Sequence, residues 1–385
     1  MRLNLILRRV SILAISLSLS ACSQIEQKSD MPDKKVLSII EAPLKIATKW
    51  STSTGQGVGD KDLRLSLARA GKNLFTVDSA GNVMSINEAT GAKNWQRSLN
   101  APISAGPAVG DGKLFFGTSN GKIIAIEAET GSFAWSWGAT SEILATPKIT
   151  NNMVFIHTMD GGLSALSAID GRQLWRFTYN LPSLVLRRAS SPATYKDNII
   201  AGFANGKLMS MHMADGSTDW SYDVAHPKGR NDLQRMVDIS ADPVVKGDVV
   251  YAASYQGSLT ALTASTGQLK WERDLPSYAG LAIDNKLCYV AETKGDVVAV
   301  DSGNGATFWL QTELQGRRLS KPVIMGQNIL VGDEDGFIHW LDKTSGKIVG
   351  RFQFDKEGVE TAPIVHNNIV YILGRSGKLV ALEVN

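Results

Sequence analysis

Histidine and cysteine, which supply many metal ligands and nucleophiles, are few in this chain and widely spaced. The five histidines stand alone at positions 157, 212, 226, 339 and 366, and the two cysteines are Cys22 and Cys288. No C-x-x-C pair occurs, and no two histidines have the spacing of metal ligands. We therefore expect no metal, no other cofactor and no catalytic residues.

Three short polar stretches resemble ligand-binding loops but are incomplete. Residues 117–122 (GTSNGK) and 202–207 (GFANGK) are each one residue shorter than a phosphate-binding loop, and Ile or Leu follows where that loop has Ser or Thr. Residues 333–336 (DEDG) are too few for a calcium loop. All three occupy the same place in an internal repeat, so a hairpin turn accounts for them.

The first 21 residues have the composition of an export signal. Three Arg residues precede an apolar run over residues 10–19, which is too short to span a bilayer as a helix. The sequence LSAC that ends at Cys22 resembles the lipobox of bacterial lipoproteins, in which the Cys is acylated, with palmitate among the acyl chains. We therefore predict a signal peptide over residues 1–21 and lipid attachment at Cys22. In the alternative, ordinary signal peptidase releases a soluble periplasmic protein and Cys22 is incidental.

An acylated Cys22 would hold the chain on a membrane, because each buried methylene contributes about 0.8 kcal/mol. Ser23 follows the Cys where lipoproteins kept in the inner membrane often carry Asp, so the resemblance implies the outer membrane. Residues 22–43 contain Gln, Lys, Asp and two Pro, a composition that predicts a flexible tether between anchor and domain.

Removing the signal changes the charge balance. The signal carries three of the 40 basic residues and no acid, which leaves 37 residues of each sign in the mature chain. The apparent basicity therefore gives no support to nucleic-acid binding. With Cys22 acylated, Cys288 has no disulfide partner, and its apolar neighbours predict a packed strand residue.

A repeated frame, G-x-h-x-A-h-x-x-x-x-G-x-x-x-W, organises the rest of the chain, as in residues 121–135 (GKIIAIEAETGSFAW). The frame opens at Gly81, Gly121, Gly161, Gly206, Gly257, Gly295, Gly336 and Gly377. A second Gly follows ten residues later in the first seven, and Trp closes the first six, at Trp95, Trp135, Trp175, Trp220, Trp271 and Trp309. A period near 40 residues predicts a propeller or a solenoid.

The signals within each period are all typical of β-structure. A short polar residue before each second Gly favours a tight turn, and alternating apolar segments flank it. A segment of small residues and Pro, such as residues 105–109 (AGPAV), precedes six of the eight frames and suits an innermost strand near a crowded axis. Each period thus contains four strands and no helix, which in a ring defines the β-propeller.

The chain ends predict how the ring closes. Only eight residues follow Gly377, so the last repeat lacks its fourth strand. Residues 44–50, which end in Trp50, can supply that strand and hide the open edges. We therefore predict an all-β fold over residues 44–385: an eight-bladed β-propeller of four-stranded antiparallel blades, closed by an N-terminal strand in the last blade.

The repeated Trp residues allow two interpretations. Exposed indoles stack on sugars, so a periplasmic polysaccharide-binding propeller is one alternative function. Identical placement in most blades instead favours packing between neighbouring blades.

The repeat is irregular at two consecutive places. From the closing Trp to the next inner-strand Pro the distance is 12 residues after Trp95 and Trp135, but 17 after Trp175 and 23 after Trp220. Both insertions connect the outer strand of one blade to the inner strand of the next, so we expect them to adjoin on one face.

The composition of the two insertions favours a protein-binding surface. The first contains residues 181–188 (LPSLVLRR) and the second residues 230–238 (RNDLQRMVD). Aliphatic side chains flanked by Arg and Asp are typical of interface hot spots. The alternative is a pair of surface loops without a binding role.

The lipobox, the eight repeats, the closing strand and the loop 182–187 (PSLVLR) together resemble the BamB family, outer-membrane lipoproteins of the β-barrel assembly machinery. In that family an L-x-L-R loop and acidic residues of the next insertion contact the periplasmic POTRA region of BamA. By this resemblance the partner-binding residues are Leu184, Leu186, Arg187, Arg188 and Asp238. Ser240 stands where the family has a second acid, which puts one contact in question.

The resemblance implies a non-enzymatic subunit, present as one copy within a hetero-complex with BamA and other Bam subunits. It implies attachment to the periplasmic face of the outer membrane and support for the assembly of nascent outer-membrane β-barrel proteins. We add the hypothesis that blade edges hold client strands by β-augmentation.

The alternative from another class is a quinoprotein (PQQ-dependent) dehydrogenase, whose eight-bladed propeller has a similar A-x-x-x-x-T-G-x-x-x-W frame. Those enzymes are usually much longer, and many carry adjacent cysteines, whereas this chain has only Cys22 and Cys288.

Overall fold

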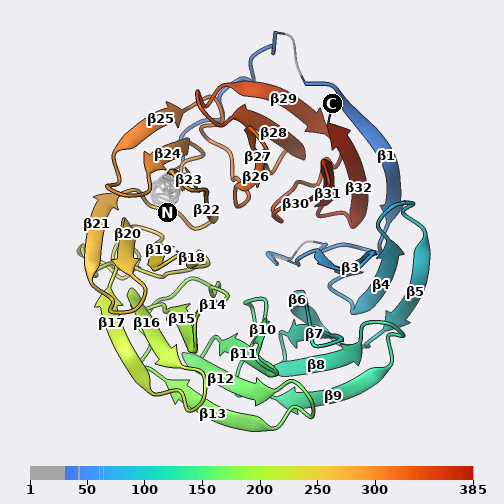
Figure 1. Cartoon of the computed structure of the whole chain (residues 1–385), viewed down its shortest axis with the longest axis vertical. Coiled ribbons are helices and arrows are strands. Elements are labelled where there is room, and N and C mark those ends of the chain that lie inside the picture. Colours follow the sequence, from blue (N-terminus) through green and yellow to red (C-terminus); the bar gives the residue numbers. More distant parts are fainter. Residues whose placement is uncertain (1–30, 42–43, 60, 64, 385) are drawn as a thin grey trace, which may run out of the picture. The chain divides into compact units, whose positions relative to one another are not determined.

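The computed structural model describes residues 31–41, 44–59, 61–63 and 65–384, and its large compact unit begins at Asp33. All regular elements of this unit are strands, which form eight four-stranded antiparallel sheets arranged as the blades of a ring (Figure 1). Among the described residues, no helix has the length and apolar character needed to cross a membrane. The predicted signal peptide and the predicted acylation site at Cys22 lie outside the described residues.

The four strands of each blade follow one another from the inside of the ring outward. Blades 1 to 4 contain β2 (Ala68–Ala70), β3 (Asn73–Val77), β4 (Asn82–Asn87) and β5 (Lys93–Ser98); β6 (Ile103–Gly110), β7 (Lys113–Thr118), β8 (Lys122–Glu127) and β9 (Phe133–Gly138); β10 (Lys148–Thr150), β11 (Met153–Thr158), β12 (Gly162–Ser167) and β13 (Gln173–Thr178); and β14 (Ala193–Tyr195), β15 (Asn198–Gly202), β16 (Lys207–His212) and β17 (Thr218–Asp223). Blades 5 to 8 contain β18 (Val244–Lys246), β19 (Val249–Ala253), β20 (Ser258–Thr263) and β21 (Leu269–Asp274); β22 (Gly280–Ile283), β23 (Leu287–Ala291), β24 (Val297–Asp301) and β25 (Thr307–Gln311); β26 (Val323–Met325), β27 (Asn328–Gly332), β28 (Phe337–Asp342) and β29 (Ile348–Gln353); and β30 (Ile364–His366), β31 (Ile369–Leu373), β32 (Lys378–Val384) and β1 (Ile46–Ser53).

The eighth blade joins the two ends of the chain, as the sequence predicts. Its order is β1-β32-β31-β30, and β1 pairs antiparallel with β32 over its whole length. Trp50 lies opposite Ala381, and the strand continues to Ser53, three residues beyond the predicted end. The ring is therefore closed by hydrogen bonds between the first and last strands.

Most of the prolines predicted to lie within the inner strands instead lie directly before them. In five blades the short inner strand begins directly after the Pro, as at Pro147 and β10 or Pro322 and β26. Proline has no N–H to donate to a ladder, so it precedes the paired residues. Pro107 lies within its strand, at a register shift where β6 leaves the ladder with β7.

Adjacent blades interlock through the closing Trp of one blade and the second Gly of the next. Trp175 packs against Gly216, where an added Cβ would come within 2.6 Å of the indole, and its Nε1–H donates to the carbonyl oxygen of Met213 at 2.7 Å. Gly216 also has a φ of +74°, so Gly suits this turn for two reasons. The same contact joins Trp50 to Gly91, Trp95 to Gly131, Trp135 to Gly171, Trp220 to Gly267, Trp271 to Gly305 and Trp309 to Gly346.

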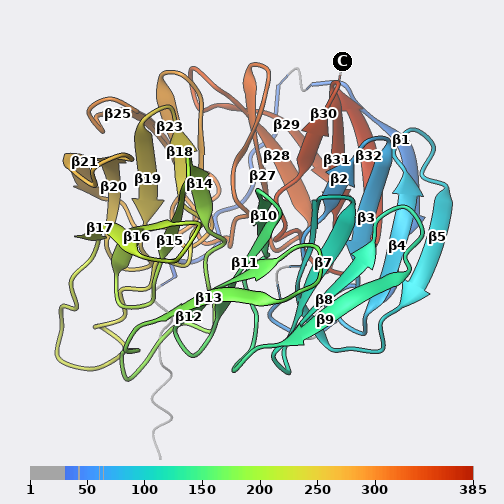
Figure 2. The same cartoon turned by 60° about the horizontal axis from the view of Figure 1, so that its bottom comes forward.

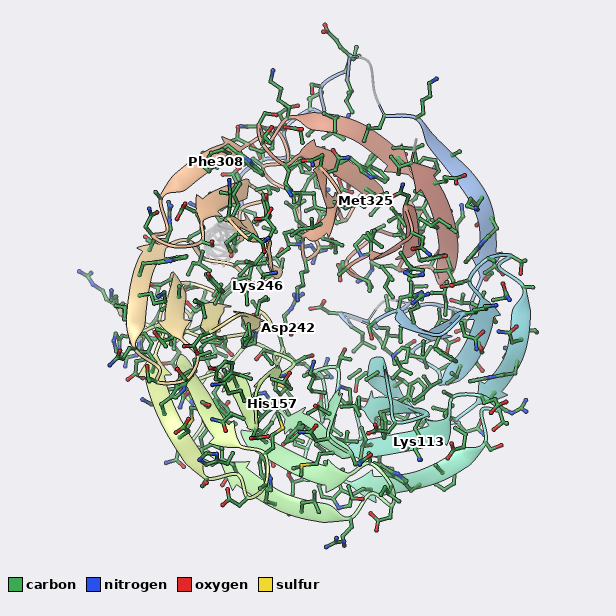
Figure 3. All side chains as sticks on the ribbon, viewed as in Figure 1. Lys113, His157, Asp242, Lys246, Phe308 and Met325 are labelled. Carbon is green, nitrogen blue, oxygen red and sulfur yellow. The ribbon has the colours of Figure 1, made fainter. Side chains whose placement is uncertain are left out.

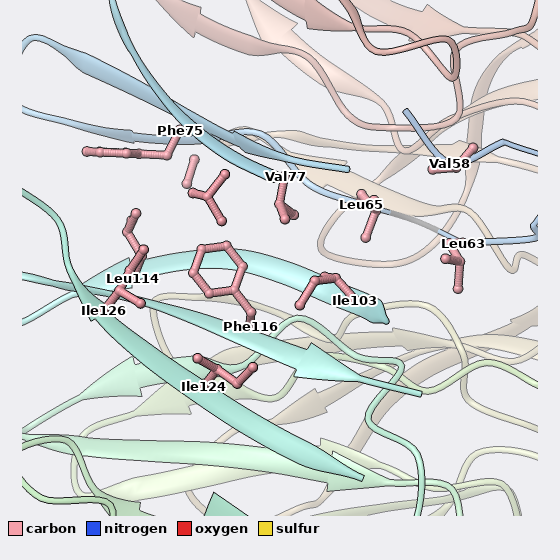
Figure 4. Packing of buried hydrophobic residues seen from close by; sticks show 12 residues of the cluster. Val58, Leu63, Leu65, Phe75, Val77, Ile103, Leu114, Phe116, Ile124 and Ile126 are labelled. Atoms are coloured by element: carbon pink, nitrogen blue, oxygen red, sulfur yellow. The ribbon is translucent and has the colours of Figure 1, made fainter. Parts of the chain in front are cut away.

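Apolar side chains fill the space between blades beneath these Trp residues. Figure 4 shows the interface of blades 1 and 2, where Phe75 and Val77 from β3 face Leu114 and Phe116 from β7. All four side chains are almost completely buried. The repeats therefore serve as scaffold, and Cys288, also buried, is a packed residue of β23.

Blade 7 has Gly350 where the other full repeats have Trp. A Cβ at Gly350 would lie 3.3 Å from atoms of Leu44 and Ile46, so the N-terminal segment occupies the space that an indole fills elsewhere. Leu44 N–H donates to the carbonyl oxygen of Val349 at 2.8 Å. The chain therefore covers the outer strand of blade 7 before it enters β1.

Candidate protein-binding site

The two insertions adjoin on one face of the propeller, as predicted. They connect β13 to β14 and β17 to β18, and the second projects well beyond the strands (Figure 2). We call this the insertion face: it carries every connection from an outer strand to the next inner strand. Two hydrogen bonds join the insertions: Leu186 N–H donates to Asp238 Oδ1 at 2.9 Å, and Ser191 N–H donates to Asp242 Oδ1 at 2.8 Å.

Asp238 lies beneath the first insertion, with 1 % of its surface exposed. Its Oδ1 accepts the Leu186 N–H, whereas its Oδ2 is buried without a hydrogen-bond partner. Burial raises the pKa of this carboxyl to about 6, and the Leu186 hydrogen bond opposes that rise. The sequence left open whether Asp238 pairs with a neighbouring Arg; in the structure it holds the backbone of the loop. Ser240, at the position of the expected second acid, is also buried.

The two Arg residues attach the first insertion to other connections of the same face. Arg187 Nη2 lies 2.6 Å from Glu142 Oε2, and Arg188 Nη2 lies 3.2 Å from Asp62 Oδ1. Arg188 also stacks on Tyr278, with its guanidinium carbon 5.2 Å from the ring centre. Arg188 is therefore fixed from two sides, while Arg187, 55 % exposed, remains at the surface.

Exposed aliphatic side chains lie on both insertions. Leu184 is 41 % exposed and Leu181 38 %, and on the second insertion Leu233 is 52 % exposed. Leu186 is half-buried and lines a small hollow with His157, Tyr179 and Asp238. Exposed aliphatic side chains and the exposed Arg187 on the same pair of loops are suited to an apolar partner surface that carries a carboxylate.

The structure thus brings the five predicted residues together but at different depths. Leu184 and Arg187 are exposed, Leu186 and Arg188 are partly covered, and Asp238 is buried. Sequence reasoning did not identify the ion-pair partners Glu142 and Asp62, because they lie on other connections and have no motif of their own.

His157 supports the first insertion from below and lies within blade 3 (Figure 3). Its Nδ1 lies 3.4 Å from the carbonyl oxygen of Ser190, and its ring meets Phe203 edge-on at 5.1 Å between centres. Burial lowers the pKa of His157 to about 4. The described part of the chain contains no cluster of His, Cys, Asp and Glu that could hold a metal ion.

Five of the six closing Trp residues are not arranged for stacking on sugars, and the sixth, Trp95, is half-buried against the core of blades 1 and 2. Trp135, Trp175, Trp220, Trp271 and Trp309 are each at most 9 % exposed. Their indole N–H groups donate to carbonyl oxygens of the next blade at 2.7–3.0 Å. The alternative of polysaccharide binding through this series therefore loses its structural basis.

The buried repeats form a β-propeller, and the two adjoining insertions give one of its faces an irregular loop surface. The family model described as "Outer membrane protein assembly factor BamB" matches residues 79–311 and 294–385. The chain belongs to the BamB family.

Curated relatives match over nearly their full length. The outer membrane protein assembly factor BamB of Alkalilimnicola ehrlichii is 42 % identical, with 98 % of this chain and 97 % of the relative covered. That of Pseudomonas aeruginosa is also 42 % identical, with 98 % and 99 % covered, and that of Escherichia coli K12 is 32 % identical, with 96 % and 97 % covered.

Solved structures agree with the fold. The crystal structure of BamB from Moraxella catarrhalis is 26 % identical, with a TM-score of 0.81 over 88 % of this chain and all of that chain. The quinohemoprotein alcohol dehydrogenase of Comamonas testosteroni has a TM-score of 0.73 over 91 % of this chain and 78 % of its own, at 12 % identity. This second likeness concerns the fold alone.

Proposed function

We propose that the chain is a non-enzymatic outer membrane protein assembly factor that docks on the periplasmic POTRA region of BamA through its insertion face. The observation that carries the proposal is the cluster of exposed Leu184 and Arg187 on a loop that Asp238 holds from below. In this role the propeller supports the assembly of nascent outer-membrane β-barrel proteins, together with the other Bam subunits.

The docking mechanism follows from the exposure of each residue. An exposed ion pair contributes only about 0–1 kcal/mol, so Arg187 can leave Glu142 for a partner carboxylate at little cost. Leu184 is already solvent-exposed and gains from burial against an apolar partner. Asp238 acts as a positioning residue, because its hydrogen bond to Leu186 fixes the loop.

We also propose that Cys22 is acylated and that the lipid holds the chain at the periplasmic face of the outer membrane. The lipobox and Ser23 support this part of the proposal. The mass of residues 22–35 from membrane-extracted protein tests it, because an unmodified Cys22 peptide would contradict the anchor.

Capture of the chain by the isolated periplasmic domains of BamA tests the docking surface. We expect Leu184→Ala and Arg187→Ala each to weaken the affinity at least about tenfold, as for residues at the centre of an interface. Leu269→Ala and Arg97→Ala are matched controls, because both side chains are exposed on outer strands and neither belongs to the insertions. Unchanged affinity of both insertion variants would place the interface elsewhere.

A third variant separates contact from positioning. Asp238→Ala removes no exposed group, yet it frees the Leu186 N–H from its acceptor. We expect weaker capture together with faster amide exchange over residues 181–190. Weaker capture with unchanged exchange would instead make Asp238 a direct partner contact.

A further inference from the structure

Residues 33–41 belong to the predicted flexible tether, yet they are docked on the propeller. We call them the strap. At its start, Lys34 Nζ lies 2.8 Å from Glu334 Oε1 and 2.7 Å from Asp335 Oδ1, in the turn between β27 and β28. Lys35 N–H donates to the carbonyl oxygen of Gln315 at 3.1 Å, in the connection from β25 to β26.

Two guanidinium groups of the propeller bind the backbone of the strap. Arg317 Nη1 donates to the carbonyl oxygen of Lys35 at 2.8 Å, and Arg351 Nη1 donates to that of Ser38 at 2.9 Å. Arg317 is only 6 % exposed and also faces buried Asp333, with 3.5 Å between Nε and Oδ2. The strap therefore satisfies N–H groups of cations that are already fixed, and such bonds are stronger than those between neutral groups.

The side chains of the strap divide into an inner and an outer set. Leu37 and Ile40 pack against the buried core shared by blades 6 and 7. Val36 and Ile39 are 94 % and 95 % exposed. This division gives the strap one defined register on the propeller.

The propeller surface is shaped to admit the strap. Gly316 has a φ of +84°, and a Cβ there would lie 2.6 Å from the carbonyl oxygen of Asp33 and from the Cα of Lys34. Only a residue without a side chain leaves that space open.

The path of the strap determines where the chain enters the propeller. The contacts of Lys34 and Lys35 lie at the insertion face, because they involve an outer-to-inner connection and a turn of the same side. Farther along, the Ser38 carbonyl accepts from Arg351 in β29, and Leu44 N–H donates to the carbonyl oxygen of Val349 at the opposite end of that strand. Asp33, where the compact unit begins, is therefore at the insertion face.

We propose that the strap fixes the attachment point of the membrane anchor at the insertion face, so that this face is held toward the lipid surface. The inference rests on the proposed acylation of Cys22. Asp33 lies eleven positions after Cys22, a span of at most roughly 40 Å, whereas release of the strap to Ile46 would extend the reach to about 85 Å. The docked strap about halves the distance over which the propeller can move and turn.

Amide hydrogen exchange of the non-acylated chain tests the docking by itself. Leu37→Ser/Ile40→Ser removes the inner side chains, and Val36→Ser/Ile39→Ser is the matched control with the outer ones. We expect residues 33–41 to exchange at least about tenfold faster in the inner variant and at the wild-type rate in the control. Gly316→Ala, which changes only the propeller side, should give the same release. Equal exchange of residues 33–41 in the wild type and all three variants, with equal unfolding midpoints, would refute the docking of the strap on the propeller.

Energy transfer to a lipid dye tests the orientation on acylated protein in outer-membrane-like vesicles. A fluorophore on Asn231→Cys reports the insertion face, and one on Thr130→Cys reports a turn of the opposite face; buried Cys288 stays unlabelled. We expect stronger transfer from position 231 in the wild type and loss of that difference in Leu37→Ser/Ile40→Ser. Equal transfer from both positions in the wild type would refute the orientation. An unmodified Cys22 in protein extracted from membranes would refute the anchor, whereas protection of the strap in the exchange experiment would still support the docking.

Discussion

Replacement of Asp238 by Asn gives a prediction whose size follows from the structure. The buried carboxyl has a folded pKa of about 6 against an ordinary value of 3.8, so the folded state binds more protons than the unfolded state between these pH values. The stability that the folded state gains from the protonated Asp238 carboxyl is complete below the unfolded pKa and is lost as the pH rises through the folded pKa. Wild type should therefore lose stability relative to Asp238→Asn as the pH rises.

The magnitude comes from integrating the proton-binding difference. Ionisation of Asp238 in the folded state costs about 1.6 kcal/mol at pH 5 and about 3 kcal/mol at pH 8. The stability difference between wild type and Asp238→Asn should thus change by about 1.4 kcal/mol over this interval, in favour of the variant at high pH. Any constant effect of the amide on packing or on the Leu186 hydrogen bond cancels, because Asn does not titrate.

Equilibrium urea unfolding followed by Trp fluorescence at pH 5, 6, 7 and 8 measures this change. Wild type and variant must show equal slopes, so that midpoints convert to free energies. A pH-independent difference would refute the reasoning, because it would mean that the Asp238 carboxylate is as well solvated or paired in the folded chain as in the unfolded one.

Two further predictions concern the scaffold. Trp175→Ala should lower the free energy of unfolding by about 3–5 kcal/mol, because it empties the space over Gly216 and leaves the Met213 carbonyl without its donor. The Phe133 side chain is 66 % exposed, so Phe133→Ala should change that free energy by no more than about 0.5 kcal/mol in the same urea experiment. Burial of His157 depresses its pKa to about 4, so stability is present above the unfolded value of 6.5 and is lost as the pH falls. Relative to His157→Gln, wild type should lose about 2 kcal/mol between pH 7 and pH 4.5 in urea unfolding, and parallel pH profiles of the two proteins would contradict a buried neutral imidazole.

The fold could be predicted in detail because each repeat carries its own local signals. Turn residues before Gly, alternating strands and a closing Trp recur at a fixed spacing, so the eight blades and the N-terminal closing strand follow from short-range patterns. The prolines mark the inner strands correctly, and only their exact position relative to the first ladder bond required the structure.

The position of the site in the chain could be predicted from the sequence, but the contacts and burial of its residues could not. The lengthened intervals after Trp175 and Trp220 identify the insertions, and their composition identifies exposed Leu184 and Arg187. The depth of Asp238 depends on how two irregular loops pack, which no local periodicity encodes. The ion pair of Arg188 with Asp62 joins residues far apart in sequence. The strap lies within a stretch whose overall composition favours a linker, although Leu37 packs on the propeller and Arg317 binds the strap backbone.

The pairing of β1 with β32 also has a consequence for the order of folding. Ile46 lies opposite Val384, 338 positions later in the chain, so this ladder cannot form until both segments have been synthesised. Joining ends so far apart in an unstructured chain would cost about 5 kcal/mol of loop entropy. Seven folded blades already bring β1 and β32 together, so the entropy cost of their pairing is small only after the other blades have folded. Ring closure is thus a late step that reports the completion of all the others.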